Sequence, residues 1–98
     1  MVKNLLKDKV VLVTGASSGL GKQTAIFFSQ QGAQVVITGR NEDRLTDTLK
    51  KLEGDGHLSI AANLISPIEI DDLIKNIVNK VGPLDGVVHC AGIMQTIH

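Results

Sequence analysis

Short apolar runs alternate with amphipathic segments along the chain, and glycine or proline stands near most of the junctions. Apart from Lys9 and Gln34, aliphatic and β-branched residues fill positions 9–14 and 33–38; they occur less densely at positions 57–62 and 86–91. Unbroken runs of this kind are typical of strands that are buried on both faces, as in parallel sheets. The pattern therefore predicts four strands.

Two amphipathic segments separate the first three strands. Positions 22–31 have helical composition, and we expect Gly32 to end the helix. The second segment begins after Asn41, a good N-cap residue, and ends at Gly54. Its apolar face falls at helical spacing and consists of Leu45, Leu49 and Leu52.

A third helix is predicted between the last two strands. It begins at Ser66-Pro67-Ile68-Glu69, which combines a capping box with proline at the first helical position. It ends at Gly82. Strands and helices therefore alternate with short connections. This order predicts one α/β domain whose parallel strands are joined by right-handed crossovers.

The connection between the first strand and the first helix is rich in glycine and reads Gly15-Ala16-Ser17-Ser18-Gly19-Leu20-Gly21. The first N–H groups of a helix lack internal partners, and the helix dipole favours an anion there. Glycines permit a sharp bend and the close approach of a phosphate, and the two serines add hydroxyl donors. We expect Gly15 to make the turn, Gly19 to face the phosphate and Gly21 to open the helix.

The same segment approaches the phosphate loop of nucleoside triphosphatases, G-x-x-x-x-G-K-[ST]. Ala16 replaces the first glycine of that loop, and Gln23 replaces the hydroxyl residue that would hold magnesium. Both departures argue against this alternative. A purely structural turn is a second alternative, which the three glycines and two serines disfavour.

The segment Thr14 to Gly21 resembles the T-G-x-x-x-G-x-G motif of the short-chain dehydrogenase/reductase family and matches it at every fixed position. In that family the motif binds the pyrophosphate of NAD(P). The resemblance extends to the fourth predicted strand and covers about the first half of a family member. It implies a Rossmann-type, doubly wound parallel sheet, of which residues 1–98 hold the first β-α-β-α-β-α-β part with strand order 3-2-1-4.

The resemblance also implies an activity: NADP(H)-dependent reduction of a carbonyl or oxidation of a secondary alcohol. Among the branches of the family, the chain looks most like the 3-oxoacyl-(acyl carrier protein) reductases. The expected partners are a nicotinamide dinucleotide, a small carbonyl or acyl substrate of the parent protein, and further copies of the chain in a homo-oligomer.

The end of the second strand bears on the choice of cofactor. An acidic residue there accepts from the 2′-hydroxyl of NAD, whereas an arginine accommodates the 2′-phosphate of NADP. Gly39 and Arg40 stand at this point, and no acid precedes Glu42. We therefore expect NADP (NADPH) in preference to NAD, with a solvated surface arginine as the alternative. Ser18 stands where many relatives carry a second basic residue.

Two further segments correspond to family positions. Asn63-Leu64 stands where family members usually have Asp followed by an aliphatic residue, a pair that contacts adenine. Asn63 departs from this pattern and Leu64 fits it, with a simple turn as the alternative. His89-Cys90-Ala91-Gly92 replaces N-N-A-G and matches it at Ala91 and Gly92. We expect Cys90 to be a buried small residue and His89 to be a hydrogen-bonded core or edge histidine. The predicted cofactor-binding residues are Gly15, Ser17, Ser18, Gly19, Leu20, Gly21, Arg40, Asn63, Leu64, Ala91 and Gly92.

Composition argues against several other classes of function. Ten basic and ten acidic residues give no net charge, which argues against nucleic-acid binding through a basic face. The apolar runs are too short for a membrane-spanning segment, and the histidines and Cys90 lack the paired spacing of a zinc site. A single cysteine fits a reducing compartment, so we expect a cytoplasmic protein.

The chain contains no tyrosine, although the resembled family uses a Tyr activated by a Lys four residues later. We therefore assign no catalytic residue. We expect residues 1–98 to be the inactive, truncated cofactor-binding part of one domain. The alternative is a dinucleotide-binding module without catalysis.

Overall fold

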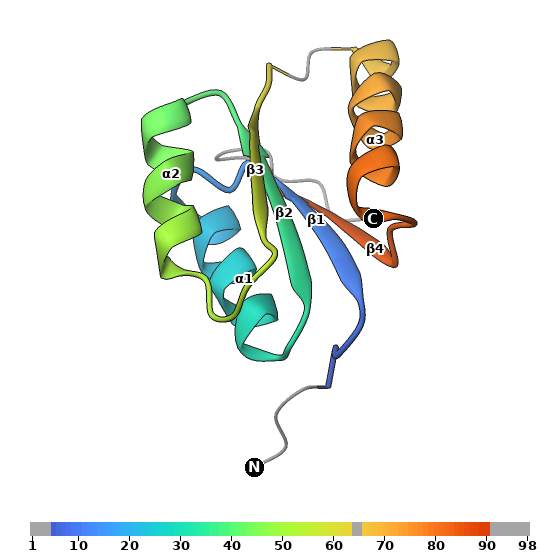
Figure 1. The fold of residues 1–98 in the computed structure, drawn as a ribbon. Helices are drawn as coiled ribbons and strands as arrows, with labels where there is room; N and C mark the ends of the chain where they lie inside the picture. Colours follow the sequence, from blue (N-terminus) through green and yellow to red (C-terminus); the bar gives the residue numbers. More distant parts are fainter. Residues whose placement is uncertain (1–4, 64–65, 91–98) are drawn as a thin grey trace.

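The structure is a computed structural model that describes residues 5–63 and 66–90. Its helices and strands alternate along the chain (Figure 1). They are β1 (Val10–Thr14), α1 (Gly19–Gln30), β2 (Gln34–Gly39), α2 (Glu42–Lys51), β3 (Leu58–Ala61), α3 (Pro67–Val81) and β4 (Gly86–His89).

The four strands form one parallel sheet in the order β3-β2-β1-β4, which confirms the predicted Rossmann-type topology. The central pair is in register from Val10 opposite Gln34 to Thr14 opposite Thr38. Helices α1 and α2 cover one face of the sheet and α3 covers the other, so the described part of the chain forms three layers (Figure 1).

The side chains of the two central strands alternate between these layers. One core cluster joins β1 and β2 to α1 and α2 through Val11, Val13, Val35, Ile37, Ala25 and Leu45. The other joins the opposite sheet face to α3 through Leu12, Val36, Leu73 and Ile77. Burying each large aliphatic side chain contributes about 1.5–3 kcal/mol, so the core holds the central strands rigidly beneath the turn that follows β1.

The predicted helix caps are confirmed. The Asn41 side chain accepts a hydrogen bond from the Arg44 N–H at 3.0 Å, and the Ser66 hydroxyl accepts one from the Glu69 N–H at 3.4 Å. Pro67 opens α3, and Gly82, with a φ of 89°, follows its end.

Two helix boundaries differ from the prediction. Helix α1 begins at Gly19 rather than residue 22, because the Lys22 N–H already bonds to the Ser18 carbonyl. Helix α2 ends at Lys51 rather than continuing to Gly54. Leu52 leaves the helix with extended dihedral angles, which lets its side chain stay buried.

The two edge strands have four residues each and are less buried than the central pair. Val87 of β4 is an exposed large apolar residue. The predicted fourth strand covered 86–91, and its last position lies outside the described residues. None of the helices in residues 5–63 and 66–90 combines the length and the hydropathy that a bilayer-spanning helix needs.

Candidate functional site

The glycine-rich turn lies at the carboxyl ends of the central strands. The Ala16 N–H donates to the Thr38 carbonyl of β2 at 3.0 Å, and the Cys90 N–H donates to the Thr14 carbonyl at 3.1 Å. The turn is therefore fixed between β2 and the end of β4. The chain order reverses here, since β2 lies on one side of β1 and β4 on the other. Open α/β sheets bind ligands at such switch points.

The three glycines of the turn have distinct geometries. Gly15 has a φ of 65°, which confirms that it makes the turn. Gly19 has a φ of 57°, and a Cβ placed on it would meet no atom within 4 Å. That open space is what a close-lying ligand needs. The prediction that Gly21 opens the helix is wrong, because Gly19 is the first helical residue.

Gly21 instead packs the helix against the turn. A Cβ on Gly21 would lie 2.0 Å from the Gly15 carbonyl oxygen and 3.1 Å from the Ala16 Cα. Gly21 is buried and belongs to the second half of the first helical turn. Its missing side chain lets the start of α1 sit directly on the backbone of the bend. The glycine is therefore needed for packing, whatever binds beside it.

Among the three described helices, α1 is the one whose N-terminus has no side-chain cap. Ser18 occupies the N-cap position but makes no side-chain hydrogen bond to the helix, unlike Asn41 of α2 and Ser66 of α3. Ser18, Gly19 and Leu20 are exposed. The first N–H groups of α1 are consequently accessible to an anion, and the helix dipole favours one there.

Arg40 and Asn63 lie at the same edge of the sheet as the turn. Arg40 follows β2 directly and is exposed, and within residues 5–63 and 66–90 its side chain has no hydrogen bond or ion pair. The Ala62 N–H donates to the Gly39 carbonyl at 2.8 Å, which places the exposed Asn63 beyond the end of β3. Three predicted site residues, namely Leu64, Ala91 and Gly92, lie outside the described residues.

Ser17 is half-buried beside the end of β2. A Cβ built on Gly39 would lie 3.3 Å from the Ser17 hydroxyl oxygen. The missing side chain of Gly39 thus leaves room for Ser17 where the turn meets the end of β2. The structure brings the turn and the Gly39–Arg40 corner together, as the sequence predicted.

The structure confirms the expectations for His89 and Cys90. His89 is an edge histidine whose Nδ1 lies 3.2 Å from the Thr14 hydroxyl, so it links β4 to β1. Cys90 is buried in the core cluster beneath α1 and α2. The described residues contain no group of three or more His, Cys, Asp or Glu side chains that could hold a metal ion.

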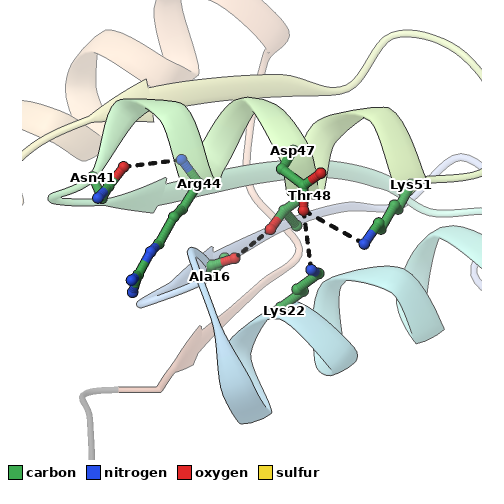
Figure 2. A network of polar contacts seen from close by, with 7 residues as sticks. All are labelled: Ala16, Lys22, Asn41, Arg44, Asp47, Thr48 and Lys51. Carbon is green, nitrogen blue, oxygen red and sulfur yellow. Dashed lines mark hydrogen bonds and ion pairs between the residues drawn. The ribbon is translucent and has the colours of Figure 1, made fainter.

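A polar network between α1 and α2 was not predicted (Figure 2). Asp47 of α2 pairs with Lys22 of α1 at 3.1 Å and with Lys51 at 3.4 Å. The hydrogen bond from Lys22, together with the positive charge of Lys51, lowers the pKa of the Asp47 carboxyl from its usual value. The network ties the helix that starts at the turn to the helix beside it.

Thr48 is a second residue that sequence reasoning missed. Its hydroxyl donates to the Ala16 carbonyl in the turn at 3.0 Å (Figure 2). A signal was present in the sequence, because Thr48 stands between Leu45 and Leu49 on the apolar face of an otherwise polar helix. A hydroxyl at such a position must find a buried partner.

A hollow of about 680 Å³ lies at the opposite end of the sheet, at the amino ends of β1 and β2. Its lining includes the carboxylates of Asp8, Glu53 and Asp55, which outnumber its single lysine, Lys9. These carboxylates repel phosphate groups, and the hollow is remote from the glycine turn. Size alone therefore does not identify the candidate site, and the charge of the lining favours the carboxyl edge for an anionic ligand.

Comparisons with known proteins agree with the motif. The family model described as short chain dehydrogenase matches residues 9–98. An uncharacterised oxidoreductase of Staphylococcus epidermidis is 41% identical over 87 residues, which are 89% of this chain and 37% of that protein. A Staphylococcus aureus oxidoreductase is 38% identical over 92% of this chain and 39% of its own length. The chain thus spans about two fifths of these curated relatives.

Solved structures give the same result. A short chain dehydrogenase from Escherichia coli CFT073 in complex with NADPH superposes with a TM-score of 0.83 and 33% identity, over 92% of this chain and 40% of that one. An actinorhodin polyketide ketoreductase variant with NADPH superposes with a TM-score of 0.78 and 36% identity, over 87% of this chain and 33% of that one.

Proposed function

The chain belongs to the short-chain dehydrogenase family, and we propose that it is the NADP(H)-binding part of an oxidoreductase that reduces a carbonyl or oxidises a secondary alcohol. The observation that carries this proposal is the geometry of the glycine turn. An uncapped helix terminus, an open Gly19 and a tightly packed Gly21 meet at the switch point of the sheet. Together they suit a pyrophosphate.

The proposed pyrophosphate site consists of the turn and the first helical turn of α1. The backbone N–H groups at the start of α1 would bond the phosphate oxygens, and the hydroxyls of Ser17 and Ser18 would add donors. Gly15 provides the bend, Gly19 the room, and Leu20 and Gly21 belong to the same N-terminal turn. When bound, the cofactor supplies or accepts a hydride, and the chain's own residues hold and orient it.

The proposed adenosine site lies farther along the same edge. Arg40 would bond the 2′-phosphate with its planar guanidinium, which suits phosphate oxygens. Asn63 and Leu64 would contact the adenine through a side-chain oxygen and a backbone N–H, and Ala91 and Gly92 would leave room for the nucleotide. NADPH in two of the structural neighbours supports the choice of NADP over NAD.

Carbonyl reduction also needs a group that donates a proton to the substrate oxygen. Residues 1–98 contain no tyrosine, so the phenol that serves this purpose in the resembled family is not among them. We assign this chain the binding and orientation of the cofactor and no acid–base step. Three expectations remain predictions from the sequence: membership of the 3-oxoacyl-(acyl carrier protein) reductase branch, a cytoplasmic location and assembly into a homo-oligomer.

Calorimetric titration with NADPH and, separately, with NADH tests the proposal. The wild-type chain should bind NADPH more tightly. Arg40→Ala should weaken NADPH binding about ten- to a hundredfold, because a charge-assisted hydrogen bond contributes about 1.5–3 kcal/mol, and should leave NADH binding unchanged. Lys50→Ala is the matched control, since it removes one exposed positive charge near the far end of α2.

Two results would contradict the proposal. A folded wild-type chain that binds neither dinucleotide would refute the assignment of the binding site to these residues. Equal losses of NADPH affinity in Arg40→Ala and Lys50→Ala would show that general electrostatics, rather than a contact from Arg40, sets the preference.

A further inference from the structure

Thr48 makes a buried contact that reaches from α2 into the glycine turn. Its side chain is fully buried, and its hydroxyl donates to the Ala16 carbonyl oxygen at 3.0 Å (Figure 2). The two residues are separated by 32 positions in the sequence. A carbonyl buried without a donor is costly, so this hydroxyl satisfies an acceptor that solvent does not reach.

The Ala16 residue is held from two directions. Its N–H donates to the Thr38 carbonyl of β2 at 3.0 Å, and its own carbonyl accepts from Thr48 of α2. Ala16 is itself fully buried. The backbone between Gly15 and Ser17 is therefore fixed by the sheet on one side and by α2 on the other.

The direction of the next N–H group follows from this contact. A trans peptide bond is planar, so the Ser17 N–H points opposite to the Ala16 carbonyl. The described residues contain no cis peptide bond. Because the Ala16 carbonyl points at Thr48 of α2, the Ser17 N–H points away from α2. The hydroxyl of Thr48 thereby sets the orientation of the peptide that leads into the uncapped start of α1.

We propose that Thr48 is a positioning residue for the glycine turn, which holds the Ala16–Ser17 peptide in the orientation that receives a phosphate. Thr48 does not touch the ligand and acts through Ala16. The identity of the ligand rests on the proposed function, whereas the restraint on the turn does not. A turn held in its binding conformation before the ligand arrives binds more tightly, because less of the population must rearrange.

The ion pairs beside Thr48 do not replace it. Asp47 is 57% exposed, and its pairs with Lys22 and Lys51 are accessible to solvent and salt. They join α1 to α2 but make no contact with the bend itself. The restraint on the Ala16 carbonyl therefore depends on the buried hydroxyl of Thr48.

The test compares three variants. Thr48→Val keeps the shape of the side chain and removes the hydroxyl, and Thr48→Ser restores the hydroxyl. Thr46→Val is the matched control, because the Thr46 hydroxyl bonds to the Glu42 carbonyl at 3.0 Å within the same helix and is exposed. Amide hydrogen exchange at Ala16 without ligand, NADPH affinity and the melting temperature are measured for each variant.

Thr48→Val should raise the exchange rate of the Ala16 amide about tenfold and weaken NADPH binding about three- to tenfold. Thr48→Ser should restore most of the slow exchange at Ala16 and most of the NADPH affinity. Thr46→Val should change neither the exchange rate nor the affinity. Unchanged exchange at Ala16 in Thr48→Val would overturn the inference, whether or not the dinucleotide binds. A lower melting temperature with unchanged exchange and affinity would show a purely structural role and would overturn it too.

If the wild-type chain binds no NADPH, the proposed function fails, and the exchange data still decide the role of Thr48. If the wild-type chain binds NADPH and Thr48→Val binds it equally well, the positioning role fails and the proposed function stands. The two failures are thereby distinguishable.

Discussion

Replacing Gly21 with alanine should destabilise the chain strongly. The added Cβ would lie 2.0 Å from the Gly15 carbonyl oxygen and 2.7 Å from the Gly15 carbonyl carbon. Ordinary van der Waals contact begins near 3.4 Å, so α1 and the turn must separate by about 1.4 Å. Both neighbouring atoms are backbone, so no side-chain rotation relieves the overlap. Overpacking of this kind costs about 3 kcal/mol, a large fraction of the stability of a small domain.

The other glycines provide a graded comparison. Gly19→Ala places its Cβ in open space and should cost about 1 kcal/mol, because Gly19 adopts a left-handed conformation. Gly86→Ala meets no atom within 4 Å and has no positive φ, so it should be nearly neutral.

Thermal and urea unfolding followed by circular dichroism measures the three variants. At about 4–8 °C per kcal/mol, Gly21→Ala should melt more than about 10 °C below Gly86→Ala or fail to fold. A Gly21→Ala chain that melts within a few degrees of Gly86→Ala would refute the packing of α1 on the turn.

Two further predictions concern α2. Asn41→Ala removes the side-chain cap of α2 and should lower the unfolding free energy, measured by urea titration, by about 1 kcal/mol. The control is Asn76→Ala in the exposed middle of α3, which should not lower the unfolding free energy. The hydrogen bond from Lys22 and the charge of Lys51 lower the pKa of the Asp47 carboxyl below its usual 3.8, so the stability that Asp47 contributes is complete above that pH and is lost as the pH falls through the lowered value. As the pH falls from 5 to 2, the Asp47→Asn variant should lose less unfolding free energy than the wild-type chain, and high salt should reduce this difference between the two chains. Equal pH dependence of the unfolding free energy in the two chains would contradict a contribution from the ion pairs.

Much of the fold could be predicted from local pattern. The apolar runs of β1 and β2 identified strands buried on both faces, and alternation with helices identified a parallel sheet. Asn41 and Ser66 located two helix starts because capping depends on residues a few positions apart. The glycine spacing after β1 identified the candidate site because that motif, too, consists of residues close together in the sequence.

The remaining features depend on contacts between distant segments. The contact of Gly21 with Gly15 places the start of α1 inside the glycine-rich segment, which composition alone did not reveal. The bond from Thr48 to Ala16 exists because α2 packs beside the turn. Similarly, His57 Nδ1 accepts from the Val35 N–H at 2.9 Å, a link between β2 and the segment before β3 that no short-range pattern indicates.

The proposed function requires the glycine turn to hold the pyrophosphate of a dinucleotide. NMR titration of the isotopically labelled chain with NADPH can locate the binding site, because each backbone amide reports on its own surroundings. If the turn binds the pyrophosphate, the largest shifts should fall on the amides of residues 17–21 and near Arg40, with little change at Asp55 and Gly56 at the amino end of the sheet. Shifts concentrated at Asp55 and Gly56, with the turn unaffected, would show that the dinucleotide binds elsewhere.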